Sequence, residues 1–441
     1  MTTDERNHHV LAWGCIADDV TGATDLAGNF VARGYSTIVL FGLDALRASS
    51  TPESRLADVD VVVVALKSRT APVDQAVSES LSALRFLEGA GAERIYVKYC
   101  STFDSTPRGN IGPVIDAVLD ATHETFTIAV PSFPDTGRTV YNGHLFVGGD
   151  LLSESSMRFH PLTPMTDSSV PRLLDPQTRN RVESVRLDEV RAGAGALSAR
   201  FGELSSGTPG TIAVVDAVTD DDLATISTAA SGLRIVTGGS GLALGLAPSG
   251  RSDAHSITVA HGHRAILCGS ASLRTREQIA RARSGGVPWR KLDLDEVRTD
   301  PNGTVARTIE WARSSWLDDP GSTPLVYSVD ELGDIAGADA GFDAAAAIED
   351  VIGAIADGLV DAGARQIIVA GGETSGRVIA QLGVQALAIG APIAPGVSWS
   401  EARTHRGAIV DLALKSGNFG DPDMFLTAWH ALDAANEGGR A

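Results

Sequence analysis

The chain has 441 residues, with 36 Lys and Arg against 55 Asp and Glu, which gives a formal net charge of −19. This length predicts two or three domains, and 43% hydrophobic with 21% charged residues is typical of a folded globular protein. The acidic excess disfavours nucleic acid and anionic membranes as partners. We therefore expect small-molecule substrates, and a locally basic site for any that is an anion.

The cysteine content and the N-terminus indicate a reducing compartment. Three cysteines without a CxxC motif or a Cys/His cluster predict neither a disulfide framework nor a zinc site. The polar start, MTTDERNHHV, lacks the apolar core of a signal peptide, and no apolar run approaches the ~20 residues of a membrane span. We expect a cytoplasmic protein.

Short β-branched runs alternate with longer Ala- and Leu-rich stretches. The runs expected as strands are TIVLF (37–41), VDVVVVAL (59–66), RIYVKYC (94–100), FTIAVP (126–131), TIAVVDA (211–217), RIVTG (234–238), RAILCG (264–269), PLVYSV (324–329) and RQIIVAGG (365–372). Helical spacing of apolar residues separates several of them, as in 76–91. Continuous apolar runs suit parallel strands covered on both faces. The expected fold class is α/β, with two domains that are each a mostly parallel sheet flanked by helices.

A polar stretch without periodicity, APSGRSDAHS (247–256), is expected to link the two domains. It divides the chain into a domain of residues 1–250 and a domain of residues 258–441. A second irregular stretch, from Gly148 to about Pro176, is rich in aromatic residues and Met, which favours a lid or a subunit contact.

In open α/β sheets, ligands bind beyond the carboxyl ends of the strands, so the residues after each strand are the candidates for a site. The first junction, CIADDVTGATDLAGNF (15–30), places Asp18 and Asp19 between a strand and a helix. Either Asp19 or Thr21 can cap that helix. Capping uses one side chain, so the second acid is available as a general base or as a holder of substrate hydroxyls.

Three further junctions of the first domain carry more polar side chains than a plain turn needs. They are KSRT (67–70), KYCSTFDSTPRGNIGP (98–113) and PSFPDTGRTVYNGH (131–144). The candidates they add are Lys67, Arg69, Lys98, Ser101, Thr102, Asp104, Asp135 and Arg138. Arginine can fork onto the carboxylate of an acidic substrate. A self-satisfied Ser/Thr turn at 101–105 and a local pair of Asp135 with Arg138 are the structural alternatives.

The second domain contains three glycine- and serine-rich turns, LCGSAS (267–272), VAGGETSGRV (369–378) and LKSGNFG (414–420). Successive backbone N–H groups at such a turn, together with a helix N-terminus, form an anion-binding nest. Three of them favour nucleotide phosphates, although none is a GxxxxGK[ST] loop. Another glycine run, RIVTGGSGLALG (234–245), is one residue off the dinucleotide fingerprint, and close packing is the alternative use of its glycines.

Taken in order along the chain, these motifs resemble the four-carbon acid sugar kinase family. The matching segments are IADDVTGATD, KYCSTFDSTPRGNIGP, PSFPDTGRTVYNGHLFVGGDLL, HPLTPMTD, GGETSG and LKSGNFG, which span about Cys15 to Phe425. The CSTFDST form and the HPLTPMTD loop are similar to the 3-oxo-tetronate branch of that family.

The resemblance implies that the first domain binds a sugar acid and the second binds ATP. It implies transfer of the γ-phosphoryl group to the C4 hydroxyl of a 3-oxo-tetronate. It also places nucleotide contacts on Ser270 or Ser272, on Gly371, Gly372, Glu373, Thr374 and Ser375, and on Gly417. Mg²⁺ is expected to bridge the phosphates and needs few protein ligands, so no metal-ligating residue is assigned.

The expected mechanism has Asp19 or Asp104 orienting and deprotonating the C4 hydroxyl. Lys98, Arg138 and Arg69 would hold the substrate carboxylate, and Asp18, Lys67, Ser101, Thr102 and Asp135 would complete the substrate site. A D-threonate or D-erythronate 4-kinase, a nicotinamide-dependent dehydrogenase and a non-catalytic sugar-acid sensor are the alternatives. A homodimer is only the default expectation.

Overall fold

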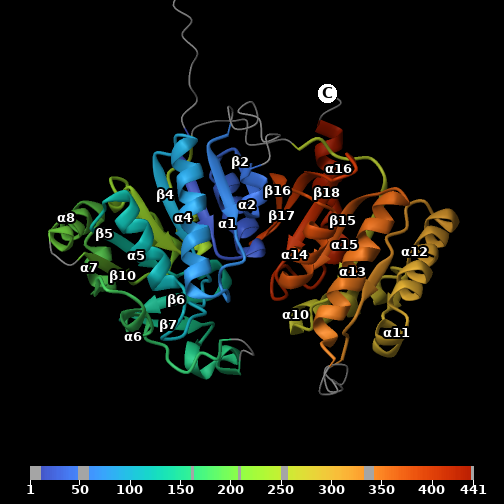
Figure 1. Cartoon of the computed structure of the whole chain (residues 1–441), viewed down its shortest axis with the longest axis horizontal. Helices are drawn as coiled ribbons and strands as arrows, with labels where there is room; N and C mark the ends of the chain where they lie inside the picture. Colours follow the sequence, from blue (N-terminus) through green and yellow to red (C-terminus); the bar gives the residue numbers. More distant parts are fainter. Residues whose placement is uncertain are drawn as a thin grey trace, which may run out of the picture. The chain divides into compact units, whose positions relative to one another are not determined.

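The computed structural model describes residues 11–47, 59–159, 163–206, 210–249, 257–331 and 342–438. Contacts divide the chain into two compact units, Met1–Ala254 (unit 1) and His255–Ala441 (unit 2) (Figure 1). Most of the expected linker, residues 250–256, lies outside the described residues, as do the N-terminal residues 1–10.

Unit 1 is built on a parallel sheet. Its strand order is β2 (Thr37–Phe41), β3 (Val61–Ala65), β1 (Trp13–Ala17), β4 (Arg94–Lys98), β11 (Ile235–Gly238), β5 (Phe126–Val130), β10 (Thr211–Val215) and β9 (Arg181–Val185). Every neighbouring pair in this order is parallel. The carboxyl ends of all these strands therefore lie along one edge of the sheet.

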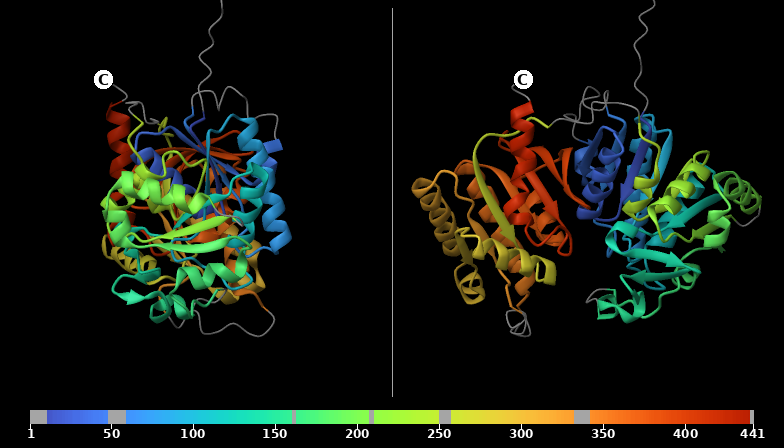
Figure 2. Two further views of the ribbon diagram at one scale, coloured as in Figure 1. Left: turned by 90° about the vertical axis from the view of Figure 1, so that its left-hand side faces the viewer. Right: turned by 180° about the vertical axis from the view of Figure 1, so that it is seen from behind.

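Helices cover both faces of this sheet, which explains the continuous apolar strands: all five residues of β3, VVVVA, are buried. One face carries α4 (Val73–Gly89) and α5 (Ile111–Thr122). The other carries α1 (Val20–Ala32), the 3₁₀ turn η5 (Ser240–Gly245) and α9 (Asp220–Ala229) (Figure 2). The described residues of unit 1 also contain α2 (Gly42–Arg47), α6 (Val170–Leu174), α7 (Leu187–Arg191) and α8 (Ala194–Ser205).

A small antiparallel sheet, which the sequence pattern did not predict, follows the expected Asp135 junction. Its strands are β6 (Arg138–Tyr141), β7 (His144–Val147) and β8 (Asp150–Leu151). Asp216, buried just after β10, accepts backbone N–H groups of Asn142 at 2.7 Å and Gly143 at 2.9 Å, which anchors the β6–β7 turn. The stretch expected to be irregular contains β8, α6 and the 3₁₀ turns η2 (Leu152–Glu154), η3 (Ser156–Phe159) and η4 (Asp175–Gln177), and 160–162 lie outside the described residues.

Unit 2 has a mostly parallel sheet. Its strand order is β13 (Trp289–Lys291), β14 (Leu325–Tyr327), β12 (His263–Cys268), β15 (Ala364–Ala370), β18 (Ile409–Lys415), β17 (Val397–Arg403) and β16 (Ala386–Ala394). The strands are parallel from β13 to β18, and β17 and β16 add antiparallel strands. The predicted fold class, two α/β domains with mostly parallel sheets, is confirmed.

The helices of unit 2 also form two layers. One layer contains α11 (Leu294–Thr299), α12 (Pro301–Asp318), α13 (Ala344–Asp361) and α14 (Gly372–Gln381). The opposite face carries α10 (Leu273–Ser284), α15 (Met424–Thr427) and α16 (Trp429–Gly438), which face the viewer in the right-hand view of Figure 2. None of the helices in the described parts of the chain combines the length and apolarity that crossing a bilayer requires.

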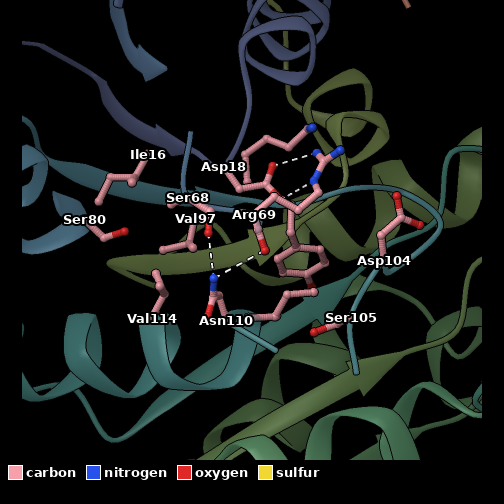
Figure 3. Close-up of a pocket in the computed structure, with 13 residues that line it drawn as sticks. Ile16, Asp18, Ser68, Arg69, Ser80, Val97, Asp104, Ser105, Asn110 and Val114 are labelled. Carbon is pink, nitrogen blue, oxygen red and sulfur yellow. Dashed lines mark hydrogen bonds and ion pairs between the residues drawn. The ribbon is translucent and has the colours of Figure 1, made fainter. Parts of the chain in front are cut away.

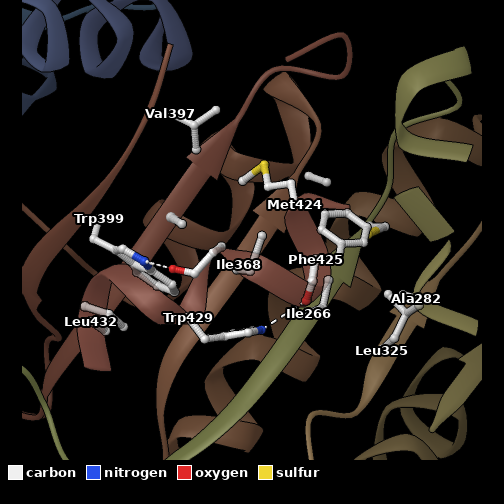
Figure 4. Packing of buried hydrophobic residues seen from close by; sticks show 14 of the residues in the cluster. Ile266, Ala282, Leu325, Ile368, Val397, Trp399, Met424, Phe425, Trp429 and Leu432 are labelled. Carbon is white, nitrogen blue, oxygen red and sulfur yellow. Dashed lines mark hydrogen bonds between the residues drawn. The ribbon is translucent and has the colours of Figure 1, made fainter. Parts of the chain in front are cut away.

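Two tryptophans connect the layer of α10, α15 and α16 to the sheet of unit 2 (Figure 4). The Trp399 indole of β17 donates to the Ala428 carbonyl at 2.9 Å, and the Trp429 indole donates to the Phe425 carbonyl at 3.0 Å. The two rings lie 5.3 Å apart between centroids. Each buried indole therefore adds apolar contact area without leaving its N–H unpaired.

The glycine run after β11 packs closely against the rest of unit 1. A Cβ at Gly239 would lie 2.7 Å from the Pro131 carbonyl oxygen, and one at Gly241 would lie 2.5 Å from that of Ser132. Backbone already occupies the space beside these glycines. Close packing, the alternative to a dinucleotide fingerprint, accounts for them.

The buried carboxyl of Asp411 in β18 predicts a pH-dependent stability. Its Oδ2 accepts the Ala260 N–H at 2.9 Å, while its Oδ1 has no hydrogen-bond partner. Burial, with repulsion from Glu401, raises the pKa of Asp411 to about 7. The folded protein thus keeps this proton to about pH 7, whereas the unfolded chain releases it near pH ~4. Wild-type stability falls as the pH rises between these values.

We expect Asp411→Asn to remove this contribution. The free energy of unfolding of the variant, relative to wild type, should rise by up to about 1.4 kcal/mol per pH unit between pH ~4 and ~7 and should not change below that window. Denaturant unfolding at a series of pH values measures this difference. The exposed Asp318→Asn is the matched control and should give a flat difference; an equally flat difference for Asp411→Asn would contradict the prediction.

Candidate active site

The backbone of Asp18 brings three strand ends of unit 1 together. Its N–H donates to the Lys98 carbonyl at the end of β4 at 3.2 Å. Its carbonyl accepts the N–H groups of Ser68 at 3.0 Å and Arg69 at 3.2 Å, in the turn after β3. Because β1 lies between β3 and β4 in the sheet, the predicted candidates Asp18, Arg69 and Lys98 lie side by side at its carboxyl edge.

One guanidinium neutralises the two adjacent acids, and Figure 3 shows its contact with Asp18. Arg69 binds Asp18 in a bidentate manner, with Nε to Oδ2 and Nη2 to Oδ1 both at 2.8 Å. The same Nη2 also donates to Asp19 Oδ1 at 2.7 Å. This fork offsets the repulsion between two neighbouring carboxylates. We call Asp18, Asp19 and Arg69 the Arg69 cluster.

The two acids of the Arg69 cluster have different environments. Asp19 is the N-cap of α1, because its Oδ1 accepts the Gly22 N–H at 3.1 Å and its Oδ2 accepts the Thr21 hydroxyl at 2.9 Å. Burial works to raise the pKa of Asp19, but Arg69, Lys98 and these donors outweigh it and hold the pKa below its usual value. Burial dominates at Asp18 and raises its pKa. Asp19 is thus the stronger acid, with both of its oxygens occupied.

Lys98 is a buried cation with a nearly unused ammonium group. Its side chain is 3% exposed, and its nearest carboxylate is Asp19, with Nζ to Oδ1 at 4.0 Å. Its Nζ makes no hydrogen bond with the described residues. A Cβ at Gly22 would overlap both Lys98 Nζ and Asp19 Oδ1, so only glycine allows helix α1 to approach the ammonium this closely. A buried ammonium with free donors is suited to binding an anion.

Asn110, just before α5, fixes the turn that carries Arg69. Its amide donates to the carbonyls of Ser68 at 2.6 Å, Arg69 at 3.3 Å and Ala71 at 2.8 Å (Figure 3). Asn110 does not cap its own helix with its side chain. The predicted site did not include it as a site residue. An Asn before a helix usually indicates a cap, so its position gave little sign of this role. The three carbonyls that it binds lie some forty positions earlier in the chain.

A small pocket opens beside the Arg69 cluster. Its polar lining consists of Asp18, Ser68, Arg69, Ser80, Lys98, Tyr99, Asp104, Ser105 and Asn110. Asp104 is 8% exposed, and its Oδ1 accepts the Thr102 hydroxyl at 2.6 Å. Its Oδ2 makes no hydrogen bond with the described residues. The pocket therefore presents one buried lysine and one carboxylate with a free oxygen.

A third acid of the first motif, Asp25, was not among the predicted site residues. It is 5% exposed, accepts the Ser240 hydroxyl with Oδ2, and leaves Oδ1 without a partner. Burial raises the pKa of Asp25 to about 6, against the nearby charges of Lys98 and Arg138. Arg138 donates to the Thr136 carbonyl and keeps a buried Nε without a partner. Asp25 stands on the buried side of α1, a signal that could have marked it.

Other predicted candidates do not line this pocket. Lys67 is exposed, and Ser101 packs against the backbone at Gly239. Asp135 is exposed and hydrogen-bonds Asp220, which together with burial raises the pKa of Asp220 to about 6. The alternative pair of Asp135 with Arg138 does not form among the described residues, and the roles of both toward substrate stay predictions.

In unit 2, the three glycine turns join at the carboxyl ends of β12, β15 and β18. The N–H groups of Gly269 and Ser270 donate to the Ala370 carbonyl at 3.1 and 3.3 Å. The Gly371 N–H donates to the Lys415 carbonyl at 2.9 Å. The Ser272 hydroxyl donates to the Gly417 carbonyl at 2.5 Å. The turns that we predicted from sequence therefore form one continuous surface.

This surface, which we call the glycine cradle, has no room for side chains at three positions. A Cβ at Gly269 or Gly371 would collide with Thr374 Oγ1, and one at Gly417 would collide with Ser270 Oγ. Gly371 also has φ 129°, which side chains rarely allow. It is the N-cap of α14, so the first N–H groups of that helix face the cradle. Backbone N–H groups at a helix N-terminus can bind a phosphate.

The remaining predicted nucleotide residues lie on the cradle with different exposure. Ser272 is the N-cap of α10 and accepts the Thr275 N–H. Ser375 is fully buried, and its hydroxyl has no hydrogen-bond partner. Glu373 is exposed on the first turn of α14. Within the described ranges, no three His, Cys, Asp or Glu side chains are grouped so that they could hold a metal ion.

Comparison with known proteins gives the same division of the chain. A family model described as "Sugar-binding N-terminal domain" matches residues 13–246. A second, described as "Nucleotide-binding C-terminal domain", matches residues 265–425. The Arg69 cluster lies within the first match and the glycine cradle within the second.

Curated relatives match over almost the whole chain. A 3-oxo-tetronate kinase of Cupriavidus necator is 43% identical and covers 98% of this chain and 99% of its own. A 3-oxo-tetronate kinase of Burkholderia multivorans is 44% identical and covers 96% and 97%. A crystal structure from Salmonella typhimurium, described as that of a tRNA synthase, is 38% identical with a TM-score of 0.84 and covers 95% of this chain and 99% of its own. The chain thus belongs to the four-carbon acid sugar kinase family and is a phosphotransferase with an alcohol group as acceptor.

Proposed function

We propose that this enzyme transfers the γ-phosphoryl group of ATP to the C4 hydroxyl of a 3-oxo-tetronate. Unit 1 would bind the sugar acid at the Arg69 cluster, and unit 2 would bind the nucleotide at the glycine cradle. The curated relatives, at 43% and 44% identity, carry the name of this kinase. A nucleic-acid substrate is disfavoured by the net charge of −19.

The observation that carries the proposal is the free ammonium of Lys98. A buried cation without hydrogen bonds is costly unless an anion binds it. The Lys98 side chain is 3% exposed, and its ammonium lies 4.0 Å from Asp19 Oδ1. Arg69 already neutralises this carboxylate. The carboxylate of a small sugar acid would supply the missing partner. Arg138, with its unpartnered Nε, is the second candidate for that carboxylate.

Arg69 has a different role in this proposal from the one that the sequence suggested. Its Nε and Nη2 already bind Asp18 and Asp19 at 2.7–2.8 Å, so two carboxylates offset its charge and only Nη1 keeps N–H groups without a partner among the described residues. We assign it to holding the two acids in place beside Lys98. Asp18 and Asp19 then shape the site and can accept substrate hydroxyls.

Between the two predicted bases, Asp104 fits the proton transfer better than Asp19. A base needs a free oxygen and a pKa that allows it to take a proton. Both oxygens of Asp19 accept hydrogen bonds and its pKa is lowered, whereas Asp104 lines the pocket with Oδ2 free. In the proposed step, the C4 hydroxyl gives its proton to Asp104 while its oxygen forms a bond to the γ-phosphorus. The bond between that phosphorus and the β–γ bridging oxygen breaks, and ADP leaves.

The glycine cradle would hold the ATP phosphates with backbone N–H groups, and the hydroxyls of Ser270 and Ser375 would be further donors, whereas that of Ser272 donates to the Gly417 carbonyl. Bound Mg²⁺ would supply charge neutralisation of the phosphates. Since the described residues contain no metal-binding cluster, the phosphates and water are its expected ligands.

The substrate itself can be tested with a panel of four-carbon acids. We expect ADP release when a dehydrogenase and NAD⁺ first convert a tetronate to its 3-oxo form, and a rate at least about tenfold lower from D-threonate or D-erythronate alone. A coupled assay of ADP measures this. Full activity on the unoxidised acids would assign the enzyme to the rival kinases, and nicotinamide reduction without added dehydrogenase would indicate a dehydrogenase.

Substitution of the two acids tests the assignment of the base. Asp104→Asn should lower kcat by about 10²- to 10⁴-fold, because the amide cannot take the proton, while the KM for ATP stays unchanged. Asp19→Asn should act mainly on the KM for the sugar acid, through the Arg69 cluster. Asp120→Asn, an exposed acid of α5, is the control for the same chemical change. A larger kcat loss in Asp19→Asn than in Asp104→Asn would reverse the assignment.

Gly22 offers a test of Lys98 without changing its charge. Gly22→Ala should push Lys98 and Asp19 apart, because the new methyl overlaps both. We expect the KM for the sugar acid to rise about tenfold or more, since a charged hydrogen bond is disturbed, with the affinity for ADP unchanged. Gly89→Ala, where a methyl meets nothing within 4 Å, is the control. Unchanged sugar-acid kinetics in Gly22→Ala would contradict the role given to Lys98.

A further inference from the structure

Unit 2 contains a second buried lysine at the end of a strand. The chain has only four lysines among its 36 basic residues, and Lys415, the last residue of β18, is fully buried. It stands directly before the turn of Gly417, which forms one side of the glycine cradle. Neither the resemblance nor the comparisons assign it a role.

The ammonium of Lys415 bonds only neutral groups. Its Nζ donates to the Thr275 hydroxyl at 2.9 Å and to the Gly417 carbonyl at 3.1 Å. An ammonium has three protons, so one has no acceptor among the described residues. No carboxylate of the described ranges forms an ion pair with it. The ring of Phe425 lies 5.9 Å away and adds a weak cation–π contact.

The surroundings make the positive charge costly as long as no anion is present. Burial lowers the pKa of Lys415 to about 8, with Cys268 of β12 opposing and Arg274 of α10 adding to the effect. On α14, the side chains of Glu373 and Arg377 are exposed. A buried cation is normally retained beside a counter-ion. The glycine cradle next to it suits an anion, because the first backbone N–H groups of α14 point out of its N-terminus at Gly371.

We propose that Lys415 is the buried counter-charge for the phosphates of the bound nucleotide, and that it positions the Gly417 turn against them. The proposal rests on the nucleotide role of unit 2 given above. It differs from a purely structural role, in which Lys415 would merely tie the Gly417 carbonyl to Thr275. A structural tie needs only hydrogen-bond donors, whereas a counter-charge needs the positive charge.

The variant Lys415→Gln separates these two roles. Glutamine keeps an N–H donor for the Gly417 carbonyl and removes the charge, whereas Lys415→Met removes both. Lys291→Gln is the matched control, since Lys291 belongs to the same unit but binds Asp330 at 2.7 Å. ADP and inorganic tripolyphosphate are the probes, and isothermal titration calorimetry measures their binding without any sugar acid.

We expect Lys415→Gln to weaken the binding of both probes by about 10- to 100-fold, as the loss of a charged hydrogen bond does. Wild type should also take up protons on binding at pH 8, approaching about half a proton per ligand, because a bound phosphate raises the pKa of Lys415. Titrations in buffers of different ionisation enthalpy reveal this uptake. It should disappear in Lys415→Gln and persist in Lys291→Gln.

Two results would overturn the proposal: wild-type affinity of Lys415→Gln for both probes, or the same proton uptake in that variant as in wild type. The design also separates this proposal from the proposed reaction. If the probes behave as expected and no four-carbon acid is phosphorylated, the sugar-acid substrate is wrong and Lys415 keeps its role. If wild type binds neither ADP nor tripolyphosphate, the nucleotide role of unit 2 and the role of Lys415 fail together.

Discussion

The site in unit 1 depends on one guanidinium shared by two adjacent carboxylates. Without Arg69, Asp18 and Asp19 would be two partly buried like charges at the end of a strand, an arrangement that costs several kcal/mol. The Arg69 guanidinium nitrogens bind the carboxylate oxygens of Asp18 and Asp19 at 2.7–2.8 Å. Asn110 and the backbone of Asp18 fix the turn that carries Arg69. Lys98, whose Nζ makes no hydrogen bond with the described residues, is then the cation proposed for the substrate carboxylate.

Each unit places one buried lysine at the carboxyl end of a parallel strand, Lys98 on β4 and Lys415 on β18. The chain has a net charge of −19, so these two buried cations are opposite in sign to the overall charge. A surface of that charge repels large polyanions, while a buried lysine in a narrow site attracts a small anion over a short distance. The same arrangement serves a carboxylate in the one proposal and a phosphate chain in the other.

Much of the fold was predictable because parallel strands covered on both faces are nearly continuous apolar runs, and the expected strands match β2–β5, β10–β12, β14 and β15 within a few residues. The strands β16, β17 and β18 were missed, since their mixed composition lacks that signal. The strand-end rule located Asp18, Arg69, Lys98 and Asp104. This rule could not tell that the carboxylates of Asp18 and Asp19 are already bound, because their partner Arg69 lies 51 residues after Asp18. Asn110 and Lys415 were missed for the same reason, because contacts with residues far along the chain define their surroundings. Asp25 could have been marked by its position on the buried side of α1.

The carbonyl of Gly417 accepts hydrogen bonds from the side chains of Ser272, Thr275 and Lys415. Rotation of this peptide plane would break several of these hydrogen bonds at once. The turn is therefore rigid before any ligand arrives. A nucleotide bound there, as proposed, would lose little free energy to ordering the loop, and this preorganisation would favour tight binding by a short stretch of backbone.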